Sequence, residues 1–327
     1  MHGTVVKLDR GFPLVRLPDE TLVRCEHAKA LVKNRDYRAV IGDEVEVDLP
    51  DGHDKGIIVE VSQRHTAFVR KDPAEQSRAQ VLAANFDLVI VAEPLVQTNL
   101  KRLERELVLA HETGADVAVV LTKADLANDE EEVEQARKTA SDLAGRDVKV
   151  VVMSASDPES VECVRRLIPA QTTAVLIGKS GVGKSSLVNL LAGSELQDTS
   201  PVRERDGKGR HTTVDRVMVR IPDGGYVVDM PGVRGLGLWD ADQGIGQAFR
   251  DIETIAEQCR FRDCKHADEP GCAVLAAVEN GQLAQSRLDS YRSLVTELEG
   301  VLERREEARH LRGEKASDRK KRRRRNG

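Results

Sequence analysis

The sequence predicts three domains: a small N-terminal β-barrel, a central α/β domain with a mostly parallel sheet, and a C-terminal helical domain. Short strands separated by turns fill the first 70 of the 327 residues, and strands alternate with helices from residue 86. After residue 232 the strand patterns end and a Cys/His cluster follows. A length of 327 residues suits two or three domains. We expect domain boundaries at 1–70, 71–235 and 236–312, with a tail at 313–327.

The N-terminal segment has the pattern of a five-stranded barrel. Val45, Val47 and Leu49 alternate with acidic residues, which is typical of a half-buried strand. Five short strands in about 65 residues predict a barrel of the OB-fold type. The pattern alone supports a generic β-barrel adaptor equally well. The expected strands are 4–7, 14–17, 21–25, 44–49 and 56–61.

The central segment alternates apolar strands with amphipathic helices. In one expected helix, residues 99–114, apolar side chains recur at helical spacing at Leu100, Leu103, Leu107 and Ala110. Apolar strands that alternate with helices predict a parallel sheet covered on both faces. The other expected elements are strands 86–91, 116–121, 148–153 and 173–177, helices 129–143 and 158–168, and a hairpin of 214–221 and 226–229.

A phosphate-binding loop follows the strand at 173–177 and opens an apolar helix. Its sequence, Gly-Lys-Ser-Gly-Val-Gly-Lys-Ser, fits G-x-x-x-x-G-K-[ST] in the setting that this P-loop motif requires. The glycines let backbone N–H groups wrap a phosphate chain. Lys184 would neutralise the β- and γ-phosphates, and the Ser185 hydroxyl would ligate Mg²⁺. An accidental Gly-rich turn is the alternative. The predicted nucleotide-binding residues here are Gly178, Lys179, Ser180, Gly181, Val182, Gly183, Lys184, Ser185 and Ser186.

A second phosphate-sensing motif lies 45 residues after Lys184. Asp229 begins a D-x-x-G sequence, in which the carboxylate holds Mg²⁺ through water and the Gly232 N–H senses the γ-phosphate. The polar stretch 194–213 is a candidate switch loop. Either Thr212 or Thr213, at its end, would complete the Mg²⁺ shell.

Two further loops predict that the base is guanine. Thr122, Lys123, Ala124 and Asp125 resemble N-K-x-D, in which the carboxylate accepts hydrogen bonds from guanine N1 and N2. Thr122 departs from the usual asparagine; it can tie the loop to the P-loop but loses the amide contact to the base. A helix start would explain this tetrapeptide equally well in isolation. The loop Ser154-Ala155-Ser156 supports the guanine interpretation, because its backbone would reach guanine O6.

The order of these motifs is permuted. A regular GTPase places the base-specificity loops after the P-loop, whereas here they precede it. A sheet tolerates this if the original termini lie close together. The segment after Gly232 then leads directly into the C-terminal helices, so it could transmit the nucleotide state to them.

Three cysteines and one histidine form a compact set late in the chain. Cys259, Cys264, His266 and Cys272 provide a complete Cys₃His shell, which predicts one structural Zn²⁺. Buried cysteines beside a surface histidine are the alternative, which the polar spacers disfavour. Two further cysteines, Cys25 and Cys163, are expected to be small apolar residues.

Charge is unevenly distributed. The last 27 residues carry a net +7 and the whole chain −5, so the other 300 residues carry −12. Residues 319–325 are all Lys or Arg, which predicts a disordered tail that contacts a polyanion. No apolar run approaches the roughly 20 residues of a membrane span. We expect a cytoplasmic monomer without a membrane partner.

Taken together, the motifs resemble the circularly permuted GTPase family of ribosome biogenesis over nearly the whole chain. The most specific segments are 178–186, 209–213, 229–238 and 259–272. The resemblance implies an OB barrel, a permuted P-loop GTPase domain and a zinc-binding helical domain. It also implies a GTPase that binds the small ribosomal subunit and its rRNA late in maturation, is stimulated by the subunit, and leaves after hydrolysis to GDP. Thr122, Lys179 and the basic tail depart from the family pattern.

The group that positions the attacking water is not evident. Val233 occupies the place of the glutamine that orients water in Ras-like enzymes. His211 is our candidate catalytic residue, since a neutral imidazole can accept from water. Packing or rRNA contact is the alternative for His211. For the whole chain, the alternatives are a P-loop ATP-dependent kinase and a non-catalytic zinc/OB RNA-binding scaffold.

Overall fold

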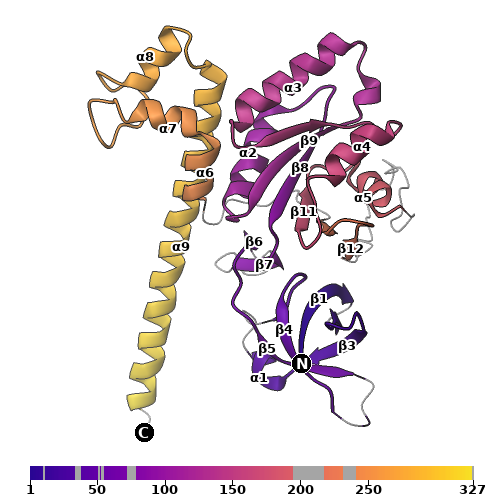
Figure 1. The fold of residues 1–327 in the computed structure, drawn as a ribbon. Coiled ribbons are helices and arrows are strands. Elements are labelled where there is room, and N and C mark those ends of the chain that lie inside the picture. The colour runs from indigo at the N-terminus through magenta and orange to yellow at the C-terminus, as the bar shows by residue number, and fades with distance from the viewer. Residues whose placement is uncertain are drawn as a thin grey trace, which may run out of the picture. The chain divides into compact units, whose positions relative to one another are not determined.

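The computed structural model describes residues 1–9, 12–33, 38–50, 52, 55–71, 79–193, 217–230 and 241–325. The chain divides into two compact units (Figure 1). The first contains Met1–Val69 and Val81–Gly235, and the second contains Arg70–Gln80 and Leu236–Gly327.

The N-terminal part of the first unit is a closed five-stranded barrel of the OB type, as predicted (Figure 1). Its strand order is β1-β2-β3-β5-β4, closed by antiparallel pairing of β1 with β4. Alternate residues, among them Val5, Val15, Val45 and Ile58, fill the interior. Cys25 lies with them, and burial raises the pKa of its thiol to about 11. The strands are β1 (His2–Asp9), β2 (Phe12–Arg16), β3 (Leu22–His27), β4 (Glu44–Asp48) and β5 (Gly56–Val61).

The second part of this unit is a six-stranded sheet of order β10-β9-β8-β11-β13-β12. Its first five strands are parallel, and β12 pairs antiparallel with β13. Because parallel strands end at one edge, the loops that follow them converge there. The strands are β8 (Leu88–Pro94), β9 (Asp116–Thr122), β10 (Lys149–Val152), β11 (Thr173–Ile177), β12 (Met218–Arg220) and β13 (Tyr226–Asp229).

Helices connect the parallel strands at the expected places. Asn99 and Asp129 accept backbone N–H bonds as N-caps, which explains where α2 and α3 begin. On α2, Leu103, Leu107 and Ala110 are buried as predicted, but Leu100, the first residue of the helix, is exposed. The helices are α2 (Leu100–His111), α3 (Glu130–Ala144), α4 (Pro158–Arg165) and α5 (Lys184–Ala192), with a 3₁₀ turn at Ala124–Leu126.

Three elements of the structure were not predicted. A short helix, α1 (Lys29–Lys33), follows β3, and β6 (Ala67–Lys71) pairs with β7 (Ala79–Ala84) in a two-stranded sheet. In addition, β12 is shorter than the expected strand at 214–221, whose first three residues lie outside the described part of the chain.

Apart from the ends of β6 and β7 in Arg70–Gln80, the described part of the second unit is helical, as expected. It contains α6 (Asp242–Ala248), α7 (Arg250–Ala256), α8 (Ala273–Glu279) and α9 (Gln285–Arg325). We expected disorder in residues 313–327, whereas α9 continues through that segment to Arg325. Lys, Arg, Glu and Ala, which dominate the segment, all have high helix propensity. Among the described residues, no helix combines the length and apolar character needed to cross a membrane.

Candidate functional site

The P-loop connects the central strand β11 to α5 at the carboxyl edge of the sheet. Gly178 has φ 140°, and a Cβ there would clash with the Ala92 carbonyl oxygen on β8. Only glycine allows this close approach of the two backbones. The Lys184 ammonium donates to the Gly178 oxygen at 2.6 Å and to the Lys179 oxygen at 3.1 Å. A buried lysine is thus held at the mouth of the loop, where a phosphate would compete for it.

The residues predicted to bind Mg²⁺ lie together beside this lysine. The Ser185 hydroxyl, at the start of α5, donates to Asp229 Oδ2 at 3.3 Å, at the end of β13. The other carboxylate oxygen, Asp229 Oδ1, is buried and has no hydrogen-bond partner in the described structure. Burial raises the pKa of Asp229, while Lys184 and Ser185 oppose that rise. A carboxylate oxygen without a hydrogen-bond partner, next to a serine hydroxyl, offers oxygen ligands of the kind that a hard cation prefers.

The base-specificity loops also meet at this edge. The Ser154 hydroxyl, after β10, donates to Asp125 Oδ1 at 2.9 Å and lies 2.8 Å from the Ser156 hydroxyl. The Ala124 N–H donates to the Met153 oxygen at 3.2 Å. The two segments that we paired from sequence are therefore adjacent in space.

The predicted tie between Thr122 and the P-loop is present. The buried Thr122 hydroxyl lies 2.6 Å from the Val182 carbonyl oxygen and 3.2 Å from that of Glu93. Lys123, in the left-handed conformation at φ 58°, donates to the Gly181 oxygen at 2.6 Å. Two consecutive side chains thus fix the base loop against the phosphate loop. His211, Thr212, Thr213 and Gly232 lie outside the described residues.

A buried group of charges that the sequence analysis missed lies beside the P-loop. Glu93 is fully buried on β8 and is paired with Arg102 of α2 through both carboxylate oxygens. Glu106, one turn along α2, is also buried, and its Oε2 has no partner in the described structure. The clue in the sequence is position, since Glu106 lies on the helix face that carries Leu103, Leu107 and Ala110. Burial and Glu93 raise the pKa of Glu106 to about 8, while Arg102 and Lys184 oppose that rise.

This carboxyl should make stability pH-dependent. The folded protein holds the proton until about pH 8, whereas the unfolded chain releases it near the ordinary pKa of 4.5. The free energy of unfolding should therefore fall as the pH rises from about 4.5 to about 8. Glutamine is neutral at every pH, so we expect Glu106→Gln to remove this fall in the free energy of unfolding. At pH 8 the variant should be more stable than wild type by on the order of 3 kcal/mol.

Urea unfolding at pH 5, 6, 7 and 8 measures this effect as the difference between variant and wild type. Glu131→Gln, a change of the same kind at an exposed position of α3, is the control and should leave the profile unchanged. Parallel profiles for Glu106→Gln and wild type would contradict the prediction.

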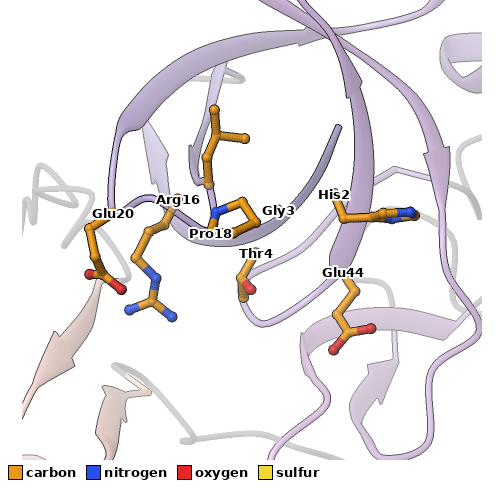
Figure 2. A pocket seen from close by; sticks show the side chains of 8 residues that line it. His2, Gly3, Thr4, Arg16, Pro18, Glu20 and Glu44 are labelled. Atoms are coloured by element: carbon orange, nitrogen blue, oxygen red, sulfur yellow. The ribbon is translucent and has the colours of Figure 1, made fainter.

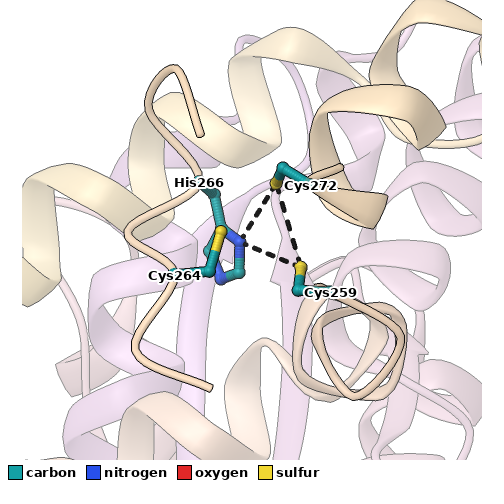
Figure 3. Close-up of side chains that lie close together, drawn as sticks. All are labelled: Cys259, Cys264, His266 and Cys272. Atoms are coloured by element: carbon teal, nitrogen blue, oxygen red, sulfur yellow. Dashed lines mark hydrogen bonds between the residues drawn. The ribbon is translucent and has the colours of Figure 1, made fainter. Parts of the chain in front are cut away.

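The four predicted zinc ligands form one cluster in the second unit (Figure 3). Their ligand atoms all lie within 4.8 Å of one another. The Cys259 and Cys272 sulfurs are 3.9 Å apart, and His266 Nδ1 lies 3.6 Å and 3.4 Å from them. Zn–S bonds of about 2.3 Å in a tetrahedron place sulfurs about 3.8 Å apart. The cluster therefore fits a structural zinc site, with Nδ1 as the histidine ligand atom.

A carboxylate shapes the loop that carries these ligands. Glu269 accepts the N–H groups of Lys265 at 2.7 Å and of Ala267 at 2.8 Å. These backbone hydrogen bonds lower the pKa of Glu269 to about 2. The backbone of this loop therefore folds around the Glu269 carboxylate. This fold directs the His266 and Cys272 side chains toward the same point.

The barrel carries a hollow of about 330 Å³ (Figure 2). Two of its lining residues also contact the β12–β13 hairpin: the Arg16 guanidinium lies 4.1 Å from the Tyr226 ring centroid, and Glu20 lies 4.0 Å from Arg220. None of the predicted nucleotide-binding or zinc residues lines this hollow. Its residues are His2, Gly3, Thr4, Arg16, Leu17, Pro18, Glu20 and Glu44.

Comparison with known proteins identifies the family. A family model described as RsgA GTPase matches residues 61–239, more than half of the chain. The chain belongs to the RsgA GTPase family. The Small ribosomal subunit biogenesis GTPase RsgA of Streptomyces coelicolor is 42% identical over 305 residues, which are 92% of this chain and 81% of that protein. The protein of the same name from Methanosarcina acetivorans is 38% identical over 262 residues, or 79% and 69% of the two chains.

Solved structures agree with this assignment. YjeQ from Thermotoga maritima matches with a TM-score of 0.68 and 27% identity, covering 91% of this chain and 98% of its own. YloQ, described as a circularly permuted GTPase, matches with a TM-score of 0.65 and 26% identity, covering 91% and 95%. The permuted GTPase fold predicted from motif order is therefore confirmed. The chain is a GTP-hydrolysing enzyme of the RsgA family, and the kinase and scaffold alternatives are not supported.

Proposed function

We propose that this RsgA-family protein hydrolyses GTP while bound to the small ribosomal subunit, late in the maturation of that subunit. The observation that carries this proposal is that Thr122 contacts the P-loop and lies in the same loop as Asp125, which is bonded to Ser154. This arrangement joins a guanine-reading carboxylate to a phosphate-binding loop. The printed names of the relatives, which describe small ribosomal subunit biogenesis GTPases, support the biological setting. We place the protein in the cytoplasm as a monomer.

In this proposal different residues at the carboxyl edge of the sheet bind the base, the phosphates and the Mg²⁺ ion. Asp125 accepts from guanine N1 and N2, while the backbone at Ser154 and Ala155 approaches O6. Lys184 and the N–H groups of the P-loop hold the β- and γ-phosphates. Ser185 and Asp229, with Thr212 or Thr213, hold the Mg²⁺ that accompanies GTP, and Gly232 senses the γ-phosphate. The functional parts are the barrel at 1–70, the GTPase domain at 71–235, the zinc domain at 236–312 and the tail at 313–327.

Phosphate release from GTP and from ATP, each with and without purified small ribosomal subunits, tests the function. We expect slow release from GTP alone, faster release with small subunits, and little from ATP. The large subunit is the control for nonspecific stimulation by RNA. Equal turnover of ATP would contradict guanine selection, and GTP turnover that small subunits leave unchanged would contradict the ribosomal role.

Subunit stimulation should depend on His211. We propose that docking on the subunit brings this imidazole to the water that attacks the γ-phosphate, a role that Val233 cannot fill. We expect His211→Ala to keep GTP and subunit binding but to lose most of the stimulated rate. His65→Ala, in the barrel segment, is the control. Full stimulation of His211→Ala would show that the ribosome or another residue positions the water.

The basic tail should bind RNA through its charge. Residues 319–325 are seven consecutive cations, so removing everything after Gly313 should weaken subunit binding at low salt. The slope of log affinity against log salt should fall by several units, at about 0.7–0.9 for each RNA phosphate that the tail neutralises. Binding measured across a series of KCl concentrations provides this slope. GTP hydrolysis by the free protein should not change, and a changed basal rate would assign the tail to the GTPase machinery instead.

A further inference from the structure

A phenyl ring is exposed on the loop that joins the first two zinc ligands. Phe261 lies two residues after Cys259 and three before Cys264, and 42% of its surface is exposed. Three of the five phenylalanines of the chain are instead fully buried, namely Phe68, Phe86 and Phe249. Because aromatic residues are enriched where proteins meet their partners, the exposed ring is a candidate contact.

The backbone holds this ring in a fixed place. The Arg260 N–H donates to the Gly271 oxygen at 3.1 Å, which joins the loop to the residue before Cys272. Gly271 has φ 77°, and a Cβ there would lie 3.2 Å from the Arg260 Cβ, so glycine allows this close contact. With Cys259 and Cys264 as predicted zinc ligands on either side, the segment between them is preorganised for a partner.

Arginines flank the ring on both sides in sequence. The Arg260 guanidinium lies over the Phe261 ring, 5.6 Å from its centroid, which is a cation–π distance. Arg262 follows the ring and is exposed. Within the described part of the chain, neither guanidinium is paired with a carboxylate. The segment 260–263, which we call the zinc-loop tip, contains these two cations and the carboxylate of Asp263, so its net charge is +1.

The exposed phenylalanine of the barrel is arranged differently. The Lys55 ammonium lies 4.3 Å from the Phe12 ring centroid, and the same ammonium is paired with Glu26 at 2.6 Å. The cation beside Phe12 is therefore balanced within the barrel. At the zinc-loop tip the positive charge is left for a partner that is itself negative.

An unpaired nucleotide of RNA fits both features of the zinc-loop tip. Its base has a flat π face that stacks on a phenyl ring, and its phosphates carry the charge that guanidinium groups bind. Bases within a duplex are already stacked on their neighbours, so an exposed ring favours single-stranded segments. Aromatic residues make up only 3% of the chain, which leaves few other places where a base could stack.

We propose that the zinc-loop tip binds an unpaired nucleotide of RNA, with the base stacked on the face of Phe261 that Arg260 leaves uncovered and the phosphates held by Arg260 and Arg262. This contact is separate from the GTP site in the first unit and from the charge-driven binding expected of residues 319–325. It goes beyond the proposed function, because it can be tested without GTP and without ribosomal subunits.

Binding of labelled octauridylate to the full-length protein, followed by fluorescence anisotropy over a series of KCl concentrations, tests the proposal. Phe261→Leu should weaken binding about 10-fold at every salt concentration, because stacking is not ionic. Phe261→Tyr keeps an aromatic ring and should bind as the wild type does. Arg262→Gln should instead lower the slope of log affinity against log salt by about 0.7. Arg146→Gln, which removes an exposed arginine of the first unit, is the matched control and should keep the wild-type slope.

Phe261→Trp provides a direct signal of stacking. Octauridylate should quench the emission of this variant more than that of the wild type, whose one tryptophan is Trp239. An RNA duplex of the same length should bind Phe261→Leu and wild type equally, whereas a general weakening of the fold would lower the affinity for both RNAs.

The proposal is overturned if Phe261→Leu binds octauridylate within twofold of wild type, which is the result expected if the ring contacts a protein instead. It is also overturned if the duplex loses as much affinity as the single strand. Zinc analysis shows whether each variant keeps its fold. If Phe261→Leu loses zinc, Phe261→Trp decides: RNA should quench its emission, and an emission that does not respond overturns the proposal.

Discussion

Replacing Asp125 with asparagine should lower the affinity for GTP by about 10²–10³-fold and make xanthosine triphosphate the preferred nucleotide. The Ser154 hydroxyl donates to Asp125 Oδ1 at 2.9 Å, which leaves Oδ2 to face the base. In the variant, the same hydroxyl continues to donate to the amide oxygen. The amide NH₂ group would then face the N–H groups of guanine, and two donors cannot form a hydrogen bond. The same NH₂ group can donate to the C2 oxygen of xanthine.

Competition binding with a fluorescent nucleotide measures this change for GTP, xanthosine triphosphate and ATP. Asp129→Asn is a matched control, because it makes the same change four residues away at the N-cap of α3, where asparagine also caps well. We expect the control to bind GTP as the wild type does. GTP affinity in Asp125→Asn within threefold of wild type, or an equal loss in both variants, would refute the assignment of the guanine loop.

Most of the fold could be predicted because its elements carry local signals. The barrel strands alternate in polarity, and the sheet strands are continuous apolar runs joined by helices with N-cap residues such as Asn99 and Asp129. Strand β11 was predicted with its observed bounds for the same reason. The pair β6 and β7 was missed because its strands have no clear alternation of apolar and polar residues, although Asp72-Pro73 between them favours a turn. The continuation of α9 to Arg325 was missed because the high density of positive charge led us to expect disorder. The residues of this segment nevertheless have high helix propensity.

Some residues of the site could likewise be predicted from the sequence, and others could not. Motif residues such as Lys184, Asp125 and Cys272 could be found because their chemistry requires fixed spacing within a short segment. Glu106 could not, because its importance comes from burial without a partner, which depends on elements far apart in sequence. A charged residue on the apolar face of a helix is a partial signal for Glu106.

Removing one zinc ligand should unfold the ligand region of the second unit while leaving GTP binding intact. Cys272 is buried, and its sulfur also caps α8 by accepting the Leu275 N–H at 3.4 Å. Cys272→Ser is therefore an informative change, since serine retains the capping role and loses the soft thiolate ligand. Structural zinc contributes on the order of 10 kcal/mol to the folding of its site.

We expect one zinc per wild-type chain purified without chelator and almost none in Cys272→Ser, as measured by mass spectrometry of the metal. Limited proteolysis should then cut the variant between α7 and α8, where the ligands hold the chain. GTP affinity should match wild type, because the nucleotide residues belong to the first unit. Cys163→Ser, at a cysteine outside the cluster, should retain zinc and resist cleavage. Full zinc occupancy in Cys272→Ser would contradict the prediction that the site depends on this cysteine.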